Sequence, residues 1–254
     1  MTIGLGFDNL LHVQMTTALL SSTYFGPVQW YQKLNRYDLV LIEQYDSFIK
    51  QTYRNRCVIA TTQGMQSLTI PIERDNGSIQ ASATRMKDIR ISNHGKWRSE
   101  HWNALRSAYG DSPFFDYYAD DLHPFFERHW VFLFDFNLDI TQKMCELLDI
   151  TPNIELTDTF IATAAAPSSS DVTTTTTAEA LSSSLVSPSS VVHSVAGTSF
   201  ADYREAIRPK HPLPDPTFEP RSYYQVYQQK HGFLPNLSIL DLLFNMGNES
   251  ILYL

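Results

Sequence analysis

Cysteine is scarce in this sequence, and the shortage excludes two kinds of site. The 254 residues include only two cysteines, Cys57 and Cys145, which are too few for a disulfide framework. Free thiols fit a reducing compartment, so we expect a cytoplasmic protein. No second cysteine or histidine stands at ligand spacing near either one, so we expect no metal site.

Long apolar runs and phosphate-binding glycine motifs are also missing. The chain has no run of 18 apolar residues, which argues against a transmembrane helix but leaves peripheral membrane contact open. The first 14 residues lack a positively charged start and carry Asp8 and His12, so we predict no signal peptide. The string "GLGFDN" at 4–9 lacks the spacing and strand context of a dinucleotide fingerprint. The sequence therefore identifies no cofactor.

Charge is sparse as well, and it is unevenly distributed. Charged residues make up 18% of the chain, and the formal net charge is −8. Between Lys50 and Arg106, ten Lys or Arg residues face four acidic residues, which gives a net charge of +6 against −14 for the remainder. A basic segment in an acidic chain indicates a local anion site and argues against nucleic-acid binding. The alternative is that these cations pair with acids of the protein itself.

Apolar patterning predicts an α/β or α+β fold, with a small mixed sheet in the first third and a helical remainder. We expect a helix that begins near Pro27 and a hairpin turn around Gly64. The expected strands lie at 17–22, 39–44, 56–61, 66–72 and 87–92. Further helices are expected over 97–109, twice within 112–130 with Ser112 as a cap, over 138–150, and from the N-cap Ser238 to Gly247.

A polar, uncharged stretch interrupts this pattern. Of the 38 residues in 162–199, 18 are Ser or Thr and none is Lys or Arg. Such a segment buries too little apolar area to offset the entropy of ordering it. We expect a disordered linker over 156–199 that joins two parts of one domain, 15–155 and 200–254. Within the second part, 208–220 contains five prolines and is expected to form an extended strap.

Several strings, taken in order, resemble the WbqC-like protein family. They are "LLSSTYFGPVQWYQKL", "YDSFIKQTYRNRCVI", "SLTIPI", "WRSEHWNALRSAYGDSPFF" and "NLSILDLLFNMG". The resemblance covers roughly 15–155 and 200–254, and the chain looks like a bacterial member of the family. Because Met15 stands where members of the family usually begin, residues 1–14 are interpreted as an extension or a misplaced start.

The resemblance implies a role in surface-polysaccharide or O-antigen-type biosynthesis. One activity proposed for the family is transferase chemistry in which an amino acid such as glycine is transferred to a sugar. This chain departs from the members found in polysaccharide gene clusters, because the Ser/Thr-rich stretch replaces an ordered region. The alternative function is a non-catalytic protein that binds an anionic sugar or nucleotide. In both cases the expected partner is an anionic or sugar-linked small molecule.

The string "QTYRNRCVI" holds the central candidates for substrate binding. In an extended strand Arg54 and Arg56 would share one face, and two guanidinium groups that close favour an anion between them. The alternative is pairing with the acids Glu43 or Asp46. The residues expected to bind substrate are Tyr24, Lys50, Tyr53, Arg54, Asn55, Arg56 and Trp102.

The candidates for proton transfer are His101 and Glu43. His101 matches the family's "HW" and has a pKa suited to acid–base chemistry, although a packed histidine is the alternative. Glu43 ends an expected strand, where α/β sheets place ligands; it would act as a base or hold the arginines. Trp102, between Arg98 and Arg106 at helical spacing, would stack on a cation or a sugar, or pack in the core. Cys57 is not expected to act as a nucleophile.

Overall fold

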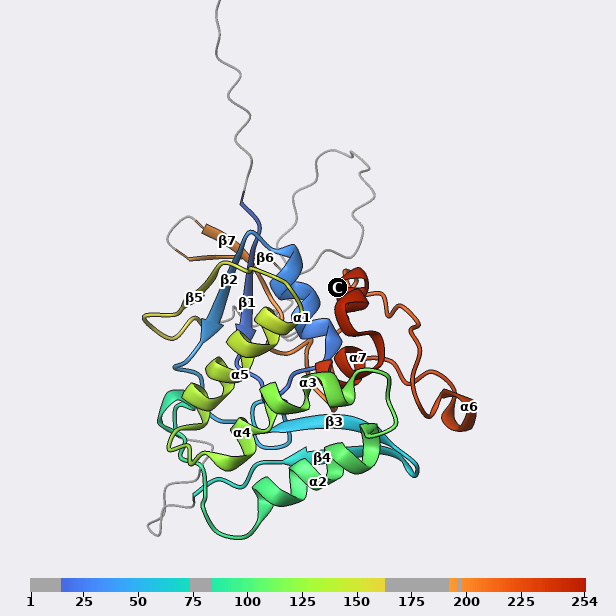
Figure 1. The fold of residues 1–254 in the computed structure, drawn as a ribbon. Coiled ribbons are helices and arrows are strands. Elements are labelled where there is room, and N and C mark those ends of the chain that lie inside the picture. Colours follow the sequence, from blue (N-terminus) through green and yellow to red (C-terminus); the bar gives the residue numbers. More distant parts are fainter. Residues whose placement is uncertain (1–14, 74–83, 163–191, 196–197) are drawn as a thin grey trace, which may run out of the picture.

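The computed structural model describes residues 15–73, 84–162, 192–195 and 198–254 (Figure 1). Its main sheet has the strand order β5-β2-β1-β7-β6. A separate hairpin, β3-β4, lies below this sheet in Figure 1. Helices pack around both, so the α/β class is confirmed.

The first strand–helix–strand unit forms as the sequence predicted. Strand β1 (Thr17–Ser21) and strand β2 (Leu39–Glu43) pair in parallel, and helix α1 (Val28–Arg36) connects them. The strands are apolar and almost fully buried, which is typical of a parallel sheet covered on both faces. Their register sets Ser21 beside Glu43, so the two strands end at the same level.

The rest of the sheet comes from distant parts of the chain. Strand β5 (Ile154–Leu156) pairs in parallel with β2, and strand β7 (Thr198–Asp202) pairs in parallel with β1 on its other side. Strand β6 (Val192–Val195) is antiparallel to β7 and forms an edge. The chain thus moves outward from β1 through β2 to β5 and then crosses to the opposite side of β1, where the order of strands reverses.

The hairpin is also as expected, but the strand predicted at 87–92 is wrong. Strand β3 (Arg56–Thr61) and strand β4 (Gly64–Thr69) are antiparallel, and Gly64 has a φ of 101°, which suits glycine at a tight turn. Residues Met86–Asp88 instead form the 3-10 helix η2. Arg90 and Ile91 then make isolated bridges, to Phe132 and Ile72, and no strand among the described residues extends beside them.

The predicted helices are present, although some of their ends differ, and the short elements Gln228–His231 and Gly247–Tyr253 were not predicted. Ser112 does not cap α3: its hydroxyl donates to the Tyr109 carbonyl oxygen at 2.6 Å, and Phe114 occupies the N-cap. Ser238 caps its helix as predicted, since its Oγ accepts from the backbone N–H of Leu240 at 3.3 Å. The remaining bounds are α2 (Trp97–Tyr109), α3 (Phe115–Leu122), α4 (Pro124–Glu127), α5 (Leu133–Leu147), α6 (Gln228–His231), α7 (Ile239–Met246) and the 3-10 helix η3 (Gly247–Tyr253).

Helix α7 joins the C-terminal part of the chain to the first part. Its residues Ile239 to Asn245 are all buried, and it contacts α1, α3 and β3. Inside it, Asp241 accepts hydrogen bonds from the Tyr109 and Tyr223 hydroxyls and from the Gln225 side chain, at 3.0, 2.7 and 2.8 Å. One apolar core therefore includes residues from both sides of the Ser/Thr-rich stretch.

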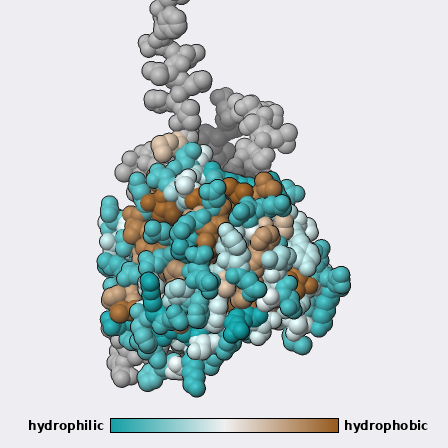
Figure 2. Space-filling model, viewed as in Figure 1, coloured by the Kyte–Doolittle hydropathy of each residue, from teal (hydrophilic) through white to brown (hydrophobic). Residues whose placement is uncertain are grey.

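Most of the expected linker lies outside the described residues. Within the range assigned to it, the structure describes residues 156–162, strand β6 and the start of β7, so these parts are not the linker that the sequence predicted. In the described residues, no helix combines the length and apolar character needed to cross a membrane. Figure 2 shows hydrophilic residues over much of one face, with hydrophobic residues gathered mainly over its upper part.

Candidate functional site

Polar side chains converge where the parallel strands end. Residues 21–23 end and follow β1, residues 43–46 end and follow β2, Thr157 follows β5, and residues 202–204 end and follow β7. Ligands of open α/β sheets bind outside the carboxyl ends of the strands, at the point where the strand order reverses. In this protein that point lies between β1 and β7.

A narrow cleft lies at this position. Its cavity volume is only about 10 Å³, room for roughly one water molecule, so a larger ligand would enter it with a single oxygen-bearing group. Hydroxyl groups, two guanidinium groups and the Trp30 indole surround it. The side chains used below are those of Ser21, Ser22, Thr23, Thr52, Arg54 and Arg204, all of which line it. We call this the carboxyl-edge cleft.

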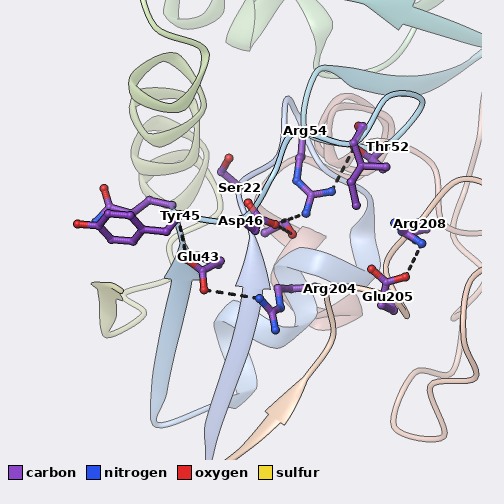
Figure 3. A network of polar contacts seen from close by, with 12 residues as sticks. Ser22, Glu43, Tyr45, Asp46, Thr52, Arg54, Arg204, Glu205 and Arg208 are labelled. Carbon is purple, nitrogen blue, oxygen red and sulfur yellow. Dashed lines mark hydrogen bonds and ion pairs between the residues drawn. The ribbon is translucent and has the colours of Figure 1, made fainter. Parts of the chain in front are cut away.

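Arg54 reaches the cleft from the loop before β3 and pairs with a buried acid (Figure 3). Its guanidinium Nη2 bonds to Asp46 Oδ2, and the two side chains are 3% and 9% exposed. Burial raises the pKa of Asp46, while the positive charge of Arg54 opposes that rise. Asp46 Oδ1 and Arg54 Nε are buried without a hydrogen-bond partner among the described residues. The pair therefore keeps an unused donor and an unused acceptor.

Arg204 pairs with acids from two strands on the other side of the cleft (Figure 3). It lies 3.5 Å from Glu43 Oε2 and 2.7 Å from Asp202 Oδ2. Glu43 is fully buried, and its carboxylate also accepts from Thr157 Oγ1 and the backbone N–H of Ile161, at 2.9 and 2.8 Å. Glu43 thus links β2, β7 and the segment after β5. This is the role of ion-pair partner, which the sequence left open beside the role of a base.

The structure separates the two arginines of "QTYRNRCVI". Strand β3 begins only at Arg56, so Arg54 lies before the strand and the expected alternation of faces does not reach it. Arg56 Nε donates to Thr69 Oγ1 at 3.2 Å on the hairpin. Lys50 is exposed and, like Arg56, does not line the cleft. The single-face clamp of Arg54 and Arg56 is therefore not formed, and Arg54 takes the alternative of pairing with Asp46.

The other predicted binding residues of this region are buried. Tyr53 lines the cleft. Asn55 donates from Nδ2 to the Ile70 carbonyl oxygen at 2.8 Å and holds the two strands of the hairpin together. The thiol of Cys57 is buried, and burial raises its pKa, which makes it a poor nucleophile.

His101 lies in the core, away from the cleft lining. Its Nδ1 is 2.9 Å from the Tyr24 hydroxyl, and it also bonds to the backbone of Thr69. Burial lowers its pKa to about 4. The contacts of His101 are those of a packed, neutral histidine, which the sequence left open as the alternative to proton transfer. Tyr24, an expected substrate-binding residue, is the hydrogen-bond partner of His101 in the core.

Trp102 packs among aromatic rings and makes no stack with the neighbouring arginines. Its ring centroid lies 4.6 Å from His123 and 5.5 Å from Phe126. Arg98 instead covers the ring of Trp97, at 4.6 Å. The core-packing alternative therefore describes Trp102.

Sequence reasoning missed the hydroxyl residues after β1 and the contribution of β7. Ser22 and Thr23 follow directly after a buried strand, a signal that could have identified them. Thr23 Oγ1 is buried and has no hydrogen-bond partner among the described residues. Arg204 gave no such signal, because only the folded chain brings it next to Glu43.

A family model matches almost the whole chain. The description of that model is "WbqC-like protein family", and the match covers residues 22–253. The chain belongs to the WbqC-like protein family. A curated relative from Mycobacterium tuberculosis (strain ATCC 25618 / H37Rv), "Uncharacterized protein Rv1507c", is 27% identical over 239 residues, which are 93% of this chain and 96% of the relative. No solved structure matches this member of the family.

The His, Cys, Asp and Glu side chains of this WbqC-like chain bear on metal binding. Across the described ranges, no group of three or more His, Cys, Asp or Glu side chains is arranged to hold a metal ion.

Proposed function

We propose that the carboxyl-edge cleft binds an anionic, hydroxyl-rich small molecule, such as a sugar-linked or nucleotide-linked compound. One observation carries this proposal: the hydroxyl groups of residues 21–23 and the guanidinium of Arg54 meet at the point where the strand order reverses. Hydroxyls and guanidinium groups suit the oxygen-rich surface of a sugar phosphate or sugar carboxylate.

The arrangement of charges supports an anionic ligand. Both arginines line the cleft, whereas Glu43 and Asp46 do not and are buried beside them. Arg54 Nε and Thr23 Oγ1 are buried and have no hydrogen-bond partner in the part of the chain that the structure describes, so an oxygen-rich ligand group that enters the cleft would supply one. A buried donor left without a partner is unfavourable, so a ligand that satisfies it gains affinity.

A thermal-shift screen with sugar phosphates and nucleotide-sugars tests this proposal. Thr23→Val, which removes a hydroxyl at nearly constant shape, should weaken binding of the best compound by roughly 3- to 10-fold, the value of one hydrogen bond. Thr62→Val on the exposed hairpin turn is the matched control and should leave the affinity unchanged. Equal affinities for the two variants, or no shift with any compound, would refute the proposal.

A second candidate function is the transferase activity in surface-polysaccharide biosynthesis, including glycine-type acyl transfer to a sugar. Asp46 favours it, because burial raises its pKa and its Oδ1, unlike the Oδ2 that pairs with Arg54, has no hydrogen-bond partner among the described residues and can accept a proton. In such a step the sugar amine or hydroxyl would lose its proton to the base and bond to the acyl carbon of an activated donor, whose leaving group would depart with the bonding electrons.

Glu43 and His101 remain the other proton-transfer candidates, and turnover decides between the two functions. The full chain would be incubated with acyl donors and the sugar compounds that bind. Transfer that is lost in His101→Gln, with binding retained, would support a catalytic histidine. Binding without product would favour the binding function. We propose a cytoplasmic location for either function, since both cysteines are free.

A further inference from the structure

A second cavity lies among the helices and shares no lining residue with the carboxyl-edge cleft. Its volume is about 260 Å³, and its walls come from helices α3, α4 and α5 (Figure 1). A cavity of this size, slightly below the range of roughly 300–1,000 Å³ that small-molecule sites occupy, suits a compact ligand. We call it the helical cavity.

The floor of the helical cavity is aromatic. The rings of Phe125 and Trp130 are stacked, with centroids 6.1 Å apart and an interplanar angle of 10°. Trp130 also packs against Phe136 at 4.9 Å, so the floor is fixed to the core. The indole Nε1 of Trp130 is buried and has no acceptor among the described residues. The floor offers an apolar surface and one unused donor.

The walls carry charges of both signs. Lys143 is already paired, with Glu146 at 2.8 Å and Asp121 at 3.8 Å. Asp120 on α3 and Arg128 after α4 differ from it, because neither side chain forms an ion pair with any residue that the structure describes. Both line the same cavity, yet they do not pair with each other, so space separates them.

Two separated charges of opposite sign over an aromatic floor match a small zwitterion. An ammonium group would bind the Asp120 carboxylate, and a carboxylate would bind the Arg128 guanidinium through two parallel hydrogen bonds. An apolar side chain would cover the Phe125 and Trp130 rings. We propose that the helical cavity binds a free α-amino acid with an apolar side chain.

Crossed variants and ligands test this proposal by calorimetric titration of the full chain. The probes are phenylalanine, its primary amide, which lacks the carboxylate, and its N-acetyl derivative, which lacks the ammonium group. Asp120 and Arg128 are exposed, and each missing charged group should weaken binding by roughly 3- to 10-fold.

The variants should show matching selectivity. Arg128→Gln should weaken phenylalanine binding by roughly 3- to 10-fold and leave binding of the amide unchanged, because the amide has no carboxylate to lose. Asp120→Asn should also weaken phenylalanine binding, but it should leave binding of the N-acetyl derivative unchanged, because that derivative has no ammonium group. The exposed residues Asp116 on α3 and Arg106 on α2 do not line the cavity, so Asp116→Asn and Arg106→Gln are matched controls.

Two outcomes would overturn the proposal. One is no binding of phenylalanine at about 10 mM, far above the dissociation constants of useful sites. The other is a variant that weakens all three probes equally, since this would mean that its charge recognises no particular group. Neither outcome bears on the carboxyl-edge cleft, because the two sites share no residue.

Discussion

Replacing Arg54 by methionine should destabilise the protein strongly. The Arg54 side chain is 3% exposed and that of its partner Asp46 is 9% exposed, so the variant leaves a buried carboxylate without its nearest cation. Breaking a buried ion pair on one side typically costs about 3–5 kcal/mol, because the remaining charge is desolvated and unpaired. Arg204 contributes a second, weaker attraction to Asp46, so we expect the lower part of this range.

A double-mutant cycle separates the pair from the rest of the loop. Arg54→Met with Asp46→Leu removes both charges and should lose less than about 2 kcal/mol, since an apolar pair often replaces a buried ion pair at little cost. Urea unfolding followed by circular dichroism would give the free energies of unfolding of all four proteins. Arg56→Met, at the more exposed start of β3, is the control and should change stability by at most about 0.5 kcal/mol.

The reasoning would be refuted if Arg54→Met behaved like Arg56→Met. It would also be refuted if the two single losses summed to the loss of the double variant, because independent residues do not form a pair. In either case the Arg54 side chain would be available to a ligand at no cost to stability, and the clamp of Arg54 and Arg56 would regain support.

Three further predictions concern the core. Burial lowers the pKa of His101 from 6.5 to about 4, so its ring should titrate at about pH 4 by NMR. The stability that depends on the neutral form of His101 should be lost as the pH falls from about 6.5 through about 4. His101→Gln should lack this loss. Burial raises the pKa of Asp241 from 3.8 to about 6. Ionisation of Asp241 should therefore lower the free energy of unfolding as the pH rises from about 4 to about 6. Asp241→Asn should remove this pH dependence, measured by urea unfolding at several pH values. Ser238→Ala should cost about 1 kcal/mol through loss of the α7 cap, measured by thermal unfolding, whereas Ser238→Thr should retain most of it.

The parts of the fold that the sequence predicted well are local. The β1-α1-β2 unit, the hairpin around Gly64 and the cap at Ser238 each depend on residues close in sequence, whose patterns and turn chemistry suffice. The strand expected at 87–92 failed for the opposite reason. Its alternating pattern was present, but a strand also requires a partner of similar length, and sequence periodicity does not reveal one.

The candidate site was predicted in part for the same reason. Glu43 and Arg54 were singled out because they lie at the end of one strand and just before another; Arg54 lines the cleft, whereas Glu43 is buried beside it. Arg204 was not found, since β7 reaches β1 only after the chain has passed β5 and the Ser/Thr-rich stretch. The sequence-based prediction also assumed that β3 extended back to Arg54. It therefore placed Arg54 and Arg56 on one face of a strand, whereas Arg54 lies in the loop before β3.

The most direct test of the carboxyl-edge cleft is a map of backbone NMR shifts during titration with a uridine diphosphate sugar. The account predicts that the largest shifts fall on residues 21–23, 52–54 and 203–204, which line the cleft, and that Thr23→Val reduces them. Shifts confined to other parts of the chain would contradict ligand binding in the cleft. The absence of shifts with the uridine diphosphate sugar and with other hydroxyl-rich anions, all at millimolar concentration, would also contradict it.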